Sequence, residues 1–248
     1  MTSCLEVDGL RKSFGKLVAI KSVSFGVSRG TVHGLIGPNG SSKTTLFNLI
    51  SGFVRPNAGV VRFEDREITG LRPYAIARLG LVRTFQLTSV YPEMSVAENV
   101  RMGLHRQRLT SAAGQPMTAA DRVDEILDLM DLSPFRSVAA RLLPAGSQRI
   151  LSIATALATR PHMLLLDEPL AGLNPTEKAE IVRKIRGVRD AGATILLVEH
   201  DIKSVLSVCD RITAINFGET IAEGTADEIV KSDRLIEAYL GNWGKAHA

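Results

Sequence analysis

Residues 37–45 read GPNGSSKTT, and they stand between the apolar run VHGLI at residues 32–36 and the run TTLFNLI at residues 44–50. The first run is typical of a buried strand and the second of a helix. A strand, a glycine-containing turn and a helix direct several backbone N–H groups at one point, where the positive end of the helix dipole also lies. This arrangement predicts a site for a polyphosphate.

The stretch matches the phosphate-binding pattern G-x-x-x-x-G-K-[ST] except that Ser42 stands at the last glycine position. In such a loop Lys43 reaches the β- and γ-phosphates, and the Thr44 hydroxyl binds Mg²⁺. A serine with helical φ fits without strain, so we expect Ser42 to lower nucleotide affinity without abolishing binding. An ordinary Gly/Ser loop with a surface lysine is the alternative. The residues expected around the phosphates are Gly37, Pro38, Asn39, Gly40, Ser41, Ser42, Lys43, Thr44 and Thr45.

The composition is that of a water-soluble globular protein of 248 residues, with 45% hydrophobic and 23% charged residues. No apolar stretch approaches the roughly 18 residues that cross a bilayer, and the N-terminus does not resemble a signal peptide. The net charge of +4 comes from dispersed basic residues, which favours solvated faces over nucleic-acid binding. Cys4 and Cys209 lack metal-ligand spacing and are typical of reduced thiols in a cytoplasmic protein.

Strand and helix patterns alternate along most of the chain, which predicts an α/β core. Between residues 87 and 143 the strand-like runs are replaced by helical spacing, which indicates an inserted helical subdomain. We expect strands at 5–7, 18–20, 23–27, 59–63, 66–68, 81–85, 163–166, 194–198, 212–215 and 220–222. We expect helices at 73–79, at 148–158 after a turn at Gly146 and Ser147, at 175–188 with Asn174 as N-cap, and at 202–208.

Polar residues directly follow three of the apolar strands, and ligands of parallel sheets bind at this edge. A buried carboxylate without a partner is costly, so Asp167 predicts a bound Mg²⁺ beside Thr44. Glu168 is then placed to act as general base for the attacking water. His200 either contacts the γ-phosphate or the water, or is a structural histidine. Gln86 either contacts Mg²⁺ or caps its strand.

Six motifs, in this order and spacing, resemble those of ABC-transporter ATPase subunits. They are GPNGSSKTT (37–45), FQ (85–86), LPAGSQ (143–148), LLLDEP (164–169), AGLNP (171–175) and VEHD (198–201). They are similar to the Walker A loop, Q-loop, signature motif, Walker B strand with catalytic glutamate, D-loop and H-loop of that family. Phe14 matches the position of the aromatic residue that stacks on adenine, although a half-buried strand residue is the alternative.

The resemblance implies a P-loop NTPase with a RecA-like, mostly parallel sheet, an N-terminal antiparallel β-subdomain and an inserted helical subdomain. The whole chain, 1–248, would be one ABC ATPase domain, with a core at 1–86 and 149–248 and the helical insert at 87–148. AGLNP, VEHD and the tail VKSDRLIEAYLG are similar to the branched-chain amino-acid transporter ATPases. Near relatives of that branch include urea and short-amide importers and the lipopolysaccharide-export ATPase.

By this resemblance the chain hydrolyses ATP with Mg²⁺ and powers import of branched-chain or related amino acids. Two subunits, identical or sisters, would sandwich two Mg·ATP, and residues 87–104 would contact integral membrane permeases. A periplasmic substrate-binding protein would take part indirectly, and nucleic acid would not. The expected location is cytoplasmic, peripheral on the inner face of the cell membrane.

The signature motif departs from the family pattern L-S-G-G-Q at Pro144, Ala145 and Ser147. Gly146 and Ser147 would still offer backbone N–H groups to the nucleotide bound by the partner subunit. These departures leave a non-hydrolysing or weakly active regulatory subunit as an alternative, beside a lipopolysaccharide-export ATPase. A soluble ABC-type ATPase of DNA repair or translation is disfavoured, because the chain has one phosphate loop and lacks CxxC motifs and heptads.

Overall fold

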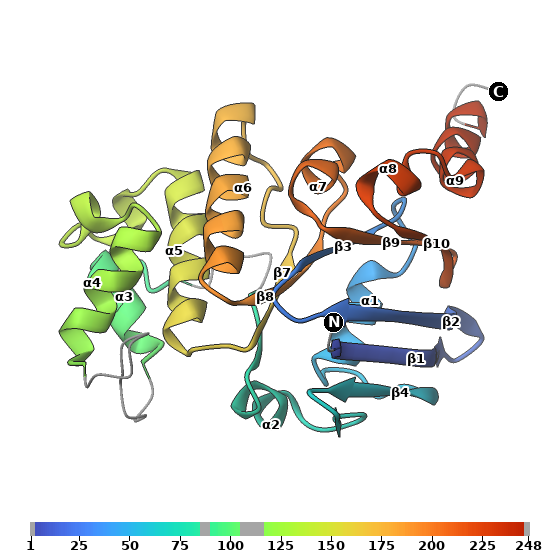
Figure 1. The fold of residues 1–248 in the computed structure, drawn as a ribbon, viewed down its shortest axis with the longest axis horizontal. Coiled ribbons are helices and arrows are strands. Elements are labelled where there is room, and N and C mark those ends of the chain that lie inside the picture. Colours follow the sequence, from blue (N-terminus) through green and yellow to red (C-terminus); the bar gives the residue numbers. More distant parts are fainter. Residues whose placement is uncertain (1–2, 85–89, 105–116, 246–248) are drawn as a thin grey trace.

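The computed structural model describes residues 3–84, 90–104 and 117–245. Gln86 and the end of the strand predicted at 81–85 therefore lie outside the described residues. A long sheet runs through the molecule, helices cover its faces, and a helical part lies at one end (Figure 1). The sheet order is β5–β4–β1–β2–β10–β9–β3–β8–β7–β6.

The parallel half of the sheet contains β9, β3, β8, β7 and β6, and the antiparallel half contains β5, β4, β1 and β2. Every residue of β3, β7 and β8 is buried, as expected for strands covered by helices on both faces. The strands are β1 (Ser3–Phe14), β2 (Leu17–Ser28), β3 (Val32–Ile36), β4 (Ala58–Phe63), β5 (Arg66–Glu67), β6 (Leu81–Arg83), β7 (Met163–Asp167), β8 (Thr194–Val198), β9 (Arg211–Asn216) and β10 (Glu219–Gly224).

The strands β1 and β2 are much longer than the short strands that we predicted. They pair as one antiparallel hairpin, in which Ser3 lies opposite Ser28 at the open end and Phe14 lies opposite Leu17 at the turn. The register shifts at several points between these two pairs. Polar residues on the exposed side interrupt the apolar runs, which is why the sequence pattern detected only fragments. The hairpin carries Phe14 to the end of the sheet where β3 ends.

Nine α-helices occur in the described part of the chain: α1 (Lys43–Ile50), α2 (Pro73–Arg78), α3 (Val96–Met102), α4 (Ala119–Leu129), α5 (Ala145–Ala158), α6 (Pro175–Asp190), α7 (Ile202–Val208), α8 (Ala226–Ile229) and α9 (Asp233–Lys245). Asn174 caps α6 in a capping box and Pro175 is its first residue, which confirms the predicted start of this helix. No helix among the described residues is long and apolar enough to cross a membrane.

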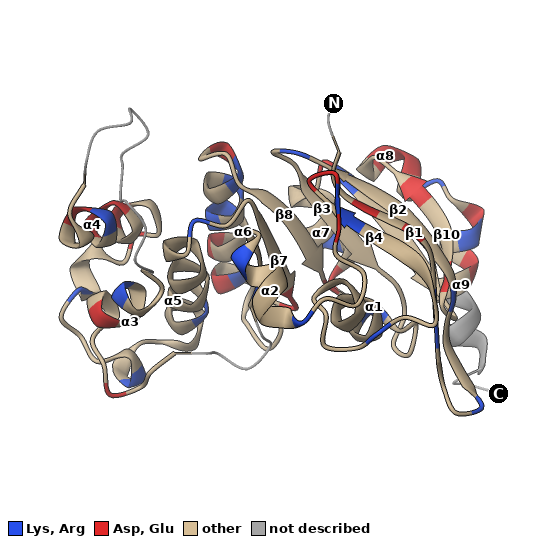
Figure 2. Cartoon of the chain, turned by 90° about the horizontal axis from the view of Figure 1, so that it is seen from below, with Lys and Arg blue, Asp and Glu red and all other residues tan. Residues whose placement is uncertain are grey.

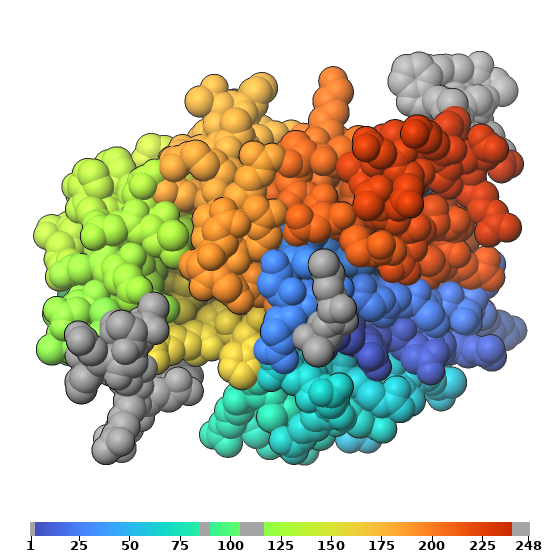
Figure 3. Space-filling model, in the orientation of Figure 1, coloured from blue at the N-terminus to red at the C-terminus, as the bar shows by residue number. Residues whose placement is uncertain are grey.

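The helical part and the parallel sheet share one apolar core. Val100 of α3, Ile126 of α4 and Ile153 of α5 belong to the same cluster of buried residues as Ile185 of α6 and Leu197 of β8. A second cluster lies around α1 and the antiparallel strands. Figure 3 shows the two ends of the molecule as one continuous body, and Figure 2 shows basic and acidic residues interspersed over it.

The start of α5 differs from the prediction, because Gly146 and Ser147 lie inside its first turn and not in a turn before it. Pro144 is the N-cap, and proline cannot extend the helix backwards with a hydrogen-bonded N–H. Gly146 is buried against α6, where an added Cβ would lie 3.1 Å from Cγ of Glu177. The close packing of α5 on α6, more than turn formation, thus explains why glycine stands at this position. The boundary that we proposed at residue 148 falls within α5.

A buried histidine lies in the middle of the parallel sheet. His33 of β3 is 1% exposed, its Nε2 is 2.8 Å from Oγ1 of Thr213, and its ring stacks on Phe25 at 5.6 Å between centroids. Burial, aided by the positive charge of Arg211, lowers the pKa of His33 to about 4. The folded protein therefore holds this ring neutral at pH values where an unfolded chain protonates it.

Because the folded pKa of His33 is lower than the unfolded one, its contribution to stability is complete above pH 6.5 and is lost as pH falls toward 4. We expect acidification from pH 7.5 to 5 to remove about 2 kcal/mol of unfolding free energy through this group. Urea unfolding at both pH values measures the difference. In His33→Gln the pH-dependent loss should shrink by that amount, and an unchanged loss would assign the effect to other groups.

Candidate functional site

The register of the parallel strands places the predicted site residues at one edge of the sheet. Val198, at the end of β8, pairs with Leu35 of β3 on one side and with Asp167 of β7 on the other. Gly37, Glu168 and the residues after Val198 therefore leave the sheet side by side. This is the edge at which parallel sheets bind ligands.

The loop after β3 folds around the side chain of Lys43. The ammonium group donates hydrogen bonds to the carbonyl oxygens of Gly37 at 2.7 Å and Pro38 at 3.0 Å, and lies 3.4 Å from Oγ of Ser41. An added Cβ at Gly37 would lie 2.2 Å from the carbonyl oxygen of Ile215, so no larger residue fits there. By binding these two carbonyl oxygens, the side chain of Lys43 holds the loop in a closed ring around its ammonium group.

The helix that follows the loop has an open N-terminus. Ser42 is the N-cap of α1 but its side chain makes no capping hydrogen bond, and the first turn contains no acidic residue. Thr44 is exposed in this turn. Unsatisfied N–H groups and a positive dipole end make such a terminus a binding site for an anion. Asn39 and Gly40 are exposed beside it, whereas Ser41 is buried beneath the loop.

Burial lowers the pKa of Lys43, and the negative charge of Glu168 acts in the opposite direction. The two side chains are therefore electrostatic neighbours across the edge of the sheet. The acidic pair at the end of β7 and the loop after β3 come together in space, although more than a hundred residues separate them in the sequence.

Ser42 differs from our expectation of helical φ, because its φ is 75° and lies in the left-handed region. The motif's glycine accepts this conformation freely, whereas the Cβ of serine crowds the backbone. The loop therefore imposes the glycine conformation on a serine, and the prediction of a strain-free fit was wrong.

We expect Ser42→Gly to raise the free energy of unfolding by about 0.5–1 kcal/mol. Relief of left-handed strain (~1–2 kcal/mol) exceeds the entropy that glycine adds to the unfolded chain (~0.5–1 kcal/mol). Equilibrium denaturation measures the change. Asp65→Gly is the control, because Asp65 has a similar φ of 63° in the β4–β5 turn, but aspartate tolerates this conformation better than serine, so its gain should be smaller. A loss of stability in Ser42→Gly alone would contradict the strain argument.

A pocket of about 560 Å³ opens directly beside the loop. Its walls come from the β1–β2 hairpin, from the loop and the first turn of α1, and from the tip of the β9–β10 hairpin. Its lining residues are Phe14, Leu17, Val18, Ala19, Lys21, Gly40, Ser42, Thr45 and Phe217. Phe14 is 47% exposed, and the ammonium of Lys12 lies 5.0 Å from its ring centre. An apolar, aromatic pocket beside a phosphate loop fits a nucleotide base.

Asp167 already has a protein partner, which corrects our reason for expecting a metal there. Its Oδ2 atom lies 2.6 Å from a guanidinium nitrogen of Arg83, and both side chains are less than a tenth exposed. The same arginine donates to Oδ1 of Asn48 at 2.7 Å and to Oγ of Ser51 at 3.1 Å. The buried carboxylate is therefore compensated without Mg²⁺.

The site nevertheless suits a magnesium ion. Within the described residues, Oδ1 of Asp167 makes no hydrogen bond, and the exposed Thr44 hydroxyl offers a second oxygen. No cluster of three or more His, Cys, Asp or Glu that could hold a metal occurs in the described part. Mg²⁺ requires none, because it keeps several waters and binds through one or two protein oxygens and substrate phosphates.

Glu168 has a constrained backbone, with φ 46°. Its N–H donates to the carbonyl oxygen of Val198 at 3.0 Å, which ties the residue to the end of β8. Non-glycine residues in this region of φ cost of order 1–3 kcal/mol and cluster at functional sites.

His200 and the residue before it lie at the same edge. Its side chain is 54% exposed, with Nδ1 3.7 Å from Oε2 of Glu199. Glu199 is fully buried and accepts hydrogen bonds from the backbone N–H groups of Leu170 at 2.6 Å and His200 at 3.2 Å. Burial raises the pKa of Glu199. This carboxylate therefore joins the segment after Glu168 to the backbone of His200.

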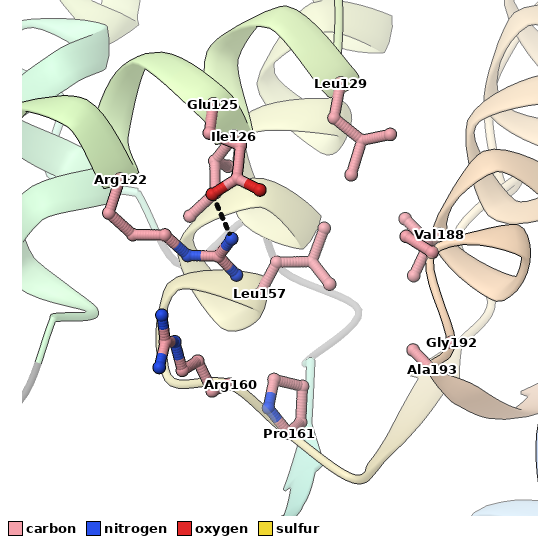
Figure 4. A pocket seen from close by; sticks show the side chains of 11 residues that line it. Arg122, Glu125, Ile126, Leu129, Leu157, Arg160, Pro161, Val188, Gly192 and Ala193 are labelled. Atoms are coloured by element: carbon pink, nitrogen blue, oxygen red, sulfur yellow. Dashed lines mark hydrogen bonds and ion pairs between the residues drawn. The ribbon is translucent and has the colours of Figure 1, made fainter. Parts of the chain in front are cut away.

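A separate hollow of about 530 Å³ lies between α4, α5 and α6 (Figure 4). Arg122, which pairs with Glu125, and Arg160 border it. Pro161 and Ala193 place this hollow beside the amino ends of β7 and β8. It thus lies at the opposite end of the strands from the loop, which separates it from the candidate site.

Comparison with known proteins is consistent with this geometry. Residues 20–171 match the family model described as ABC transporter. The chain belongs to the ABC transporter family. It is 42% identical to the high-affinity branched-chain amino acid transport ATP-binding protein BraF of Pseudomonas aeruginosa, over 96% of this chain and 97% of the relative. It is 36% identical to the lipopolysaccharide export system ATP-binding protein LptB of Acidithiobacillus ferridurans, over 98% of each.

The fold agrees with a solved ATP-binding cassette of an ABC transporter, MJ1267 in its ADP conformation. The TM-score is 0.86 at 31% identity, over 97% of this chain and all of that one. The P-loop NTPase fold and the predicted family are thereby confirmed. This ABC ATPase binds and hydrolyses ATP to power transport, and as a transporter subunit it works with membrane permeases.

The residues that we predicted to form the signature motif lie away from the loop at 37–45. Gly146 and Ser147 are on α5 in the helical part, and neither is among the described residues that line the pocket beside the loop. Pro144 and Ala145 are exposed at the start of α5, without a side-chain cap or an acidic residue in the first turn. The start of this helix is therefore exposed at Pro144 and Ala145 and has no capping side chain.

Our sequence reasoning missed Arg83, Glu199 and Phe217. Arg83 could have been found as a charged residue in the otherwise apolar strand LVR. Glu199 directly follows the buried run TILLV, which is the same signal that identified Asp167 and Glu168. No sequence pattern pointed to Phe217, because only the folded chain brings the β9–β10 turn beside the loop at 37–45.

Proposed function

We propose that this ABC ATPase binds Mg·ATP with its phosphates in the loop at 37–45 and its base beside Phe14. The observation that supports the proposal best is the ring of loop carbonyls around Lys43 at the open N-terminus of α1. The ammonium group would turn from these carbonyls to the phosphates. Pro38, Asn39, Gly40 and Thr45 would supply the surrounding backbone.

Mg²⁺ would be held by the Thr44 hydroxyl and Oδ1 of Asp167, and it would neutralise charge on the β- and γ-phosphates. Arg83 fixes the Asp167 carboxyl group by holding its other oxygen. Glu168 would accept the proton of the attacking water, and His200 would contact the γ-phosphate or that water. Gln86 remains a proposed magnesium contact, outside the described residues.

We expect Lys43→Ala to raise the Kd for Mg·ATP about 10- to 150-fold, since a hydrogen bond to a charged group contributes roughly 1.5–3 kcal/mol. Titration calorimetry with a non-hydrolysable ATP analogue measures this. Lys231→Ala, an exposed lysine on the surface, should keep the wild-type Kd. Wild-type affinity in Lys43→Ala would remove the loop from the nucleotide site.

A second ATPase subunit, identical or a sister, would complete the site. Its α5 would present the backbone N–H groups of Gly146 and Ser147 to the nucleotide held by the first subunit. The exposed start of α5 supports this arrangement, since Pro144 leaves the first turn uncapped. Sedimentation of the Glu168→Gln variant with and without Mg·ATP tests it, because the closed pair should accumulate only with nucleotide.

The transported substrate that we propose is a branched-chain or related amino acid. Higher identity to BraF, 42%, than to LptB, 36%, supports import over lipopolysaccharide export. The chain would sit on the inner face of the membrane with permeases at residues 87–104, and a periplasmic binding protein would deliver the substrate. A hollow of about 190 Å³ between α3 and α4, lined in part by Ala97 and Arg101, supports a contact there.

The substrate proposal is tested with the complete transporter in vesicles. ATP hydrolysis should rise when the binding protein is loaded with leucine or isoleucine, and should not respond to lipopolysaccharide. The reverse response would favour the export function, and Lys43→Ala provides the inactive control.

A further inference from the structure

We propose that Phe217 is a second aromatic contact for the nucleotide base, which it holds together with Phe14. This inference rests on the proposed ATP site and adds a residue from a distant part of the chain. Phe217 lines the same pocket of about 560 Å³ as Phe14 and the loop residues Gly40 and Ser42.

Phe217 occupies a turn position that phenylalanine normally avoids. Phe217 and Gly218 form the two-residue loop between β9 and β10, where Asn216 pairs with Glu219. Their φ values are 45° and 76°, so the loop is a type I′ turn, which favours Asn, Asp or Gly at both positions. A bulky residue with positive φ is strained and suggests a functional reason.

The side chain of Phe217 is not part of the apolar core that stabilises the fold. It is 71% exposed and belongs to neither apolar cluster of the protein. Leu17 and Val18 of the same pocket are also exposed, at 68% and 52%. Contiguous apolar surface of this kind marks a ligand or partner site, and here it borders the phosphate loop.

The turn that carries Phe217 is rigidly placed. The carbonyl oxygen of Gly218 accepts hydrogen bonds from the N–H groups of Lys21 at 2.8 Å and Ser22 at 3.2 Å. An added Cβ at Gly218 would lie 2.4 Å from the carbonyl oxygen of Ala19, so the turn lies directly on β2. The turn is therefore already in place beside the pocket and need not move when a ligand binds. This lowers the conformational entropy that the chain loses on binding.

A nucleotide base is the ligand group that suits two exposed aromatic rings beside a phosphate site. Stacking on an aromatic side chain strengthens binding of a base by roughly 5- to 150-fold, and it tolerates different bases because each has a π-face. The pocket should therefore prefer nucleoside triphosphates over inorganic tripolyphosphate, with little discrimination between adenine and guanine by this residue.

The test uses Phe217→Asn in the full chain, because asparagine suits a type I′ turn and keeps the protein folded. Its Kd for the Mg²⁺ complex of a non-hydrolysable ATP analogue should rise about 5- to 150-fold, whereas its Kd for magnesium tripolyphosphate should stay at the wild-type value. Phe217→Trp should retain the affinity for the analogue. Phe135→Asn, an exposed phenylalanine in the helical part, should change neither Kd.

Three results would overturn the inference. Wild-type affinity of Phe217→Asn for the ATP analogue would exclude a base contact, and equal weakening for tripolyphosphate would show that the substitution acts through the loop. In both cases the phosphate site itself would stand. If the wild-type chain binds neither probe, the proposed ATP site fails, and the base contact fails with it.

Discussion

Replacement of Glu168 by glutamine should lower kcat for ATP hydrolysis by about 10²- to 10⁴-fold, because glutamine cannot accept the proton of the attacking water. The Kd for Mg·ATP should remain close to that of the wild type, since the amide has nearly the same shape. Steady-state phosphate release gives kcat, and titration with a non-hydrolysable analogue gives Kd.

The expected effect depends on how rigidly the fold holds Glu168. Its left-handed backbone and its hydrogen bond to Val198 fix the residue between β7 and β8, close enough for its charge to act on Lys43. We therefore expect Glu168 to need no backbone rearrangement if it accepts the proton.

Glu180→Gln is the matched control, because Glu180 is an exposed carboxylate on α6. It should change neither kcat nor Kd. Wild-type kcat in Glu168→Gln would remove this residue from the role of base. A rise in Kd equal to the fall in kcat/KM would instead show that Glu168 contributes to ground-state binding.

Replacement of Arg83 by methionine should destabilise the fold by about 3–5 kcal/mol, because it leaves a buried carboxylate without its cation. Asp167 is only 8% exposed on its side chain, so water cannot replace the lost partner. The substitution also removes the donor to Asn48 and Ser51, which links β6 to α1. Chemical denaturation monitored by circular dichroism measures the change.

Two further variants isolate the ion pair. Arg78→Met, at an exposed arginine of α2, should shift stability by less than about 0.5 kcal/mol. The double variant Arg83→Met with Asp167→Asn should recover part of the loss, because the remaining group is then neutral. A cost below about 1 kcal/mol for Arg83→Met alone would contradict the inference that this pair is essential to the fold.

The local sequence was sufficient to predict most elements of the parallel core. Continuous apolar runs predicted β3, β7 and β8, because strands buried on both faces need apolar residues at nearly every position. The Asn174–Pro175 pair predicted the start of α6, because helix capping depends on the residues directly at the helix end. The order of the six motifs predicted the family. The long hairpin of β1 and β2 was predicted only in fragments, because cross-strand pairing extends strands beyond their apolar residues.

The amino-acid sequence by itself thus determined which chemical groups are present: a loop with the phosphate-binding pattern, an acidic pair after a buried strand, and a histidine two residues after the end of another buried strand. Only the tertiary structure decided which groups meet. Arg83 neutralises Asp167, Glu199 joins the segment after Glu168 to His200, and Phe217 enters the pocket of Phe14. Parallel strands are joined through helices, so neighbours at the edge of the sheet lie far apart in the chain, and no local pattern records their contact. The left-handed backbone of Ser42 could not be predicted for the same reason. The closed loop around Lys43 imposes a positive φ that serine does not favour by itself.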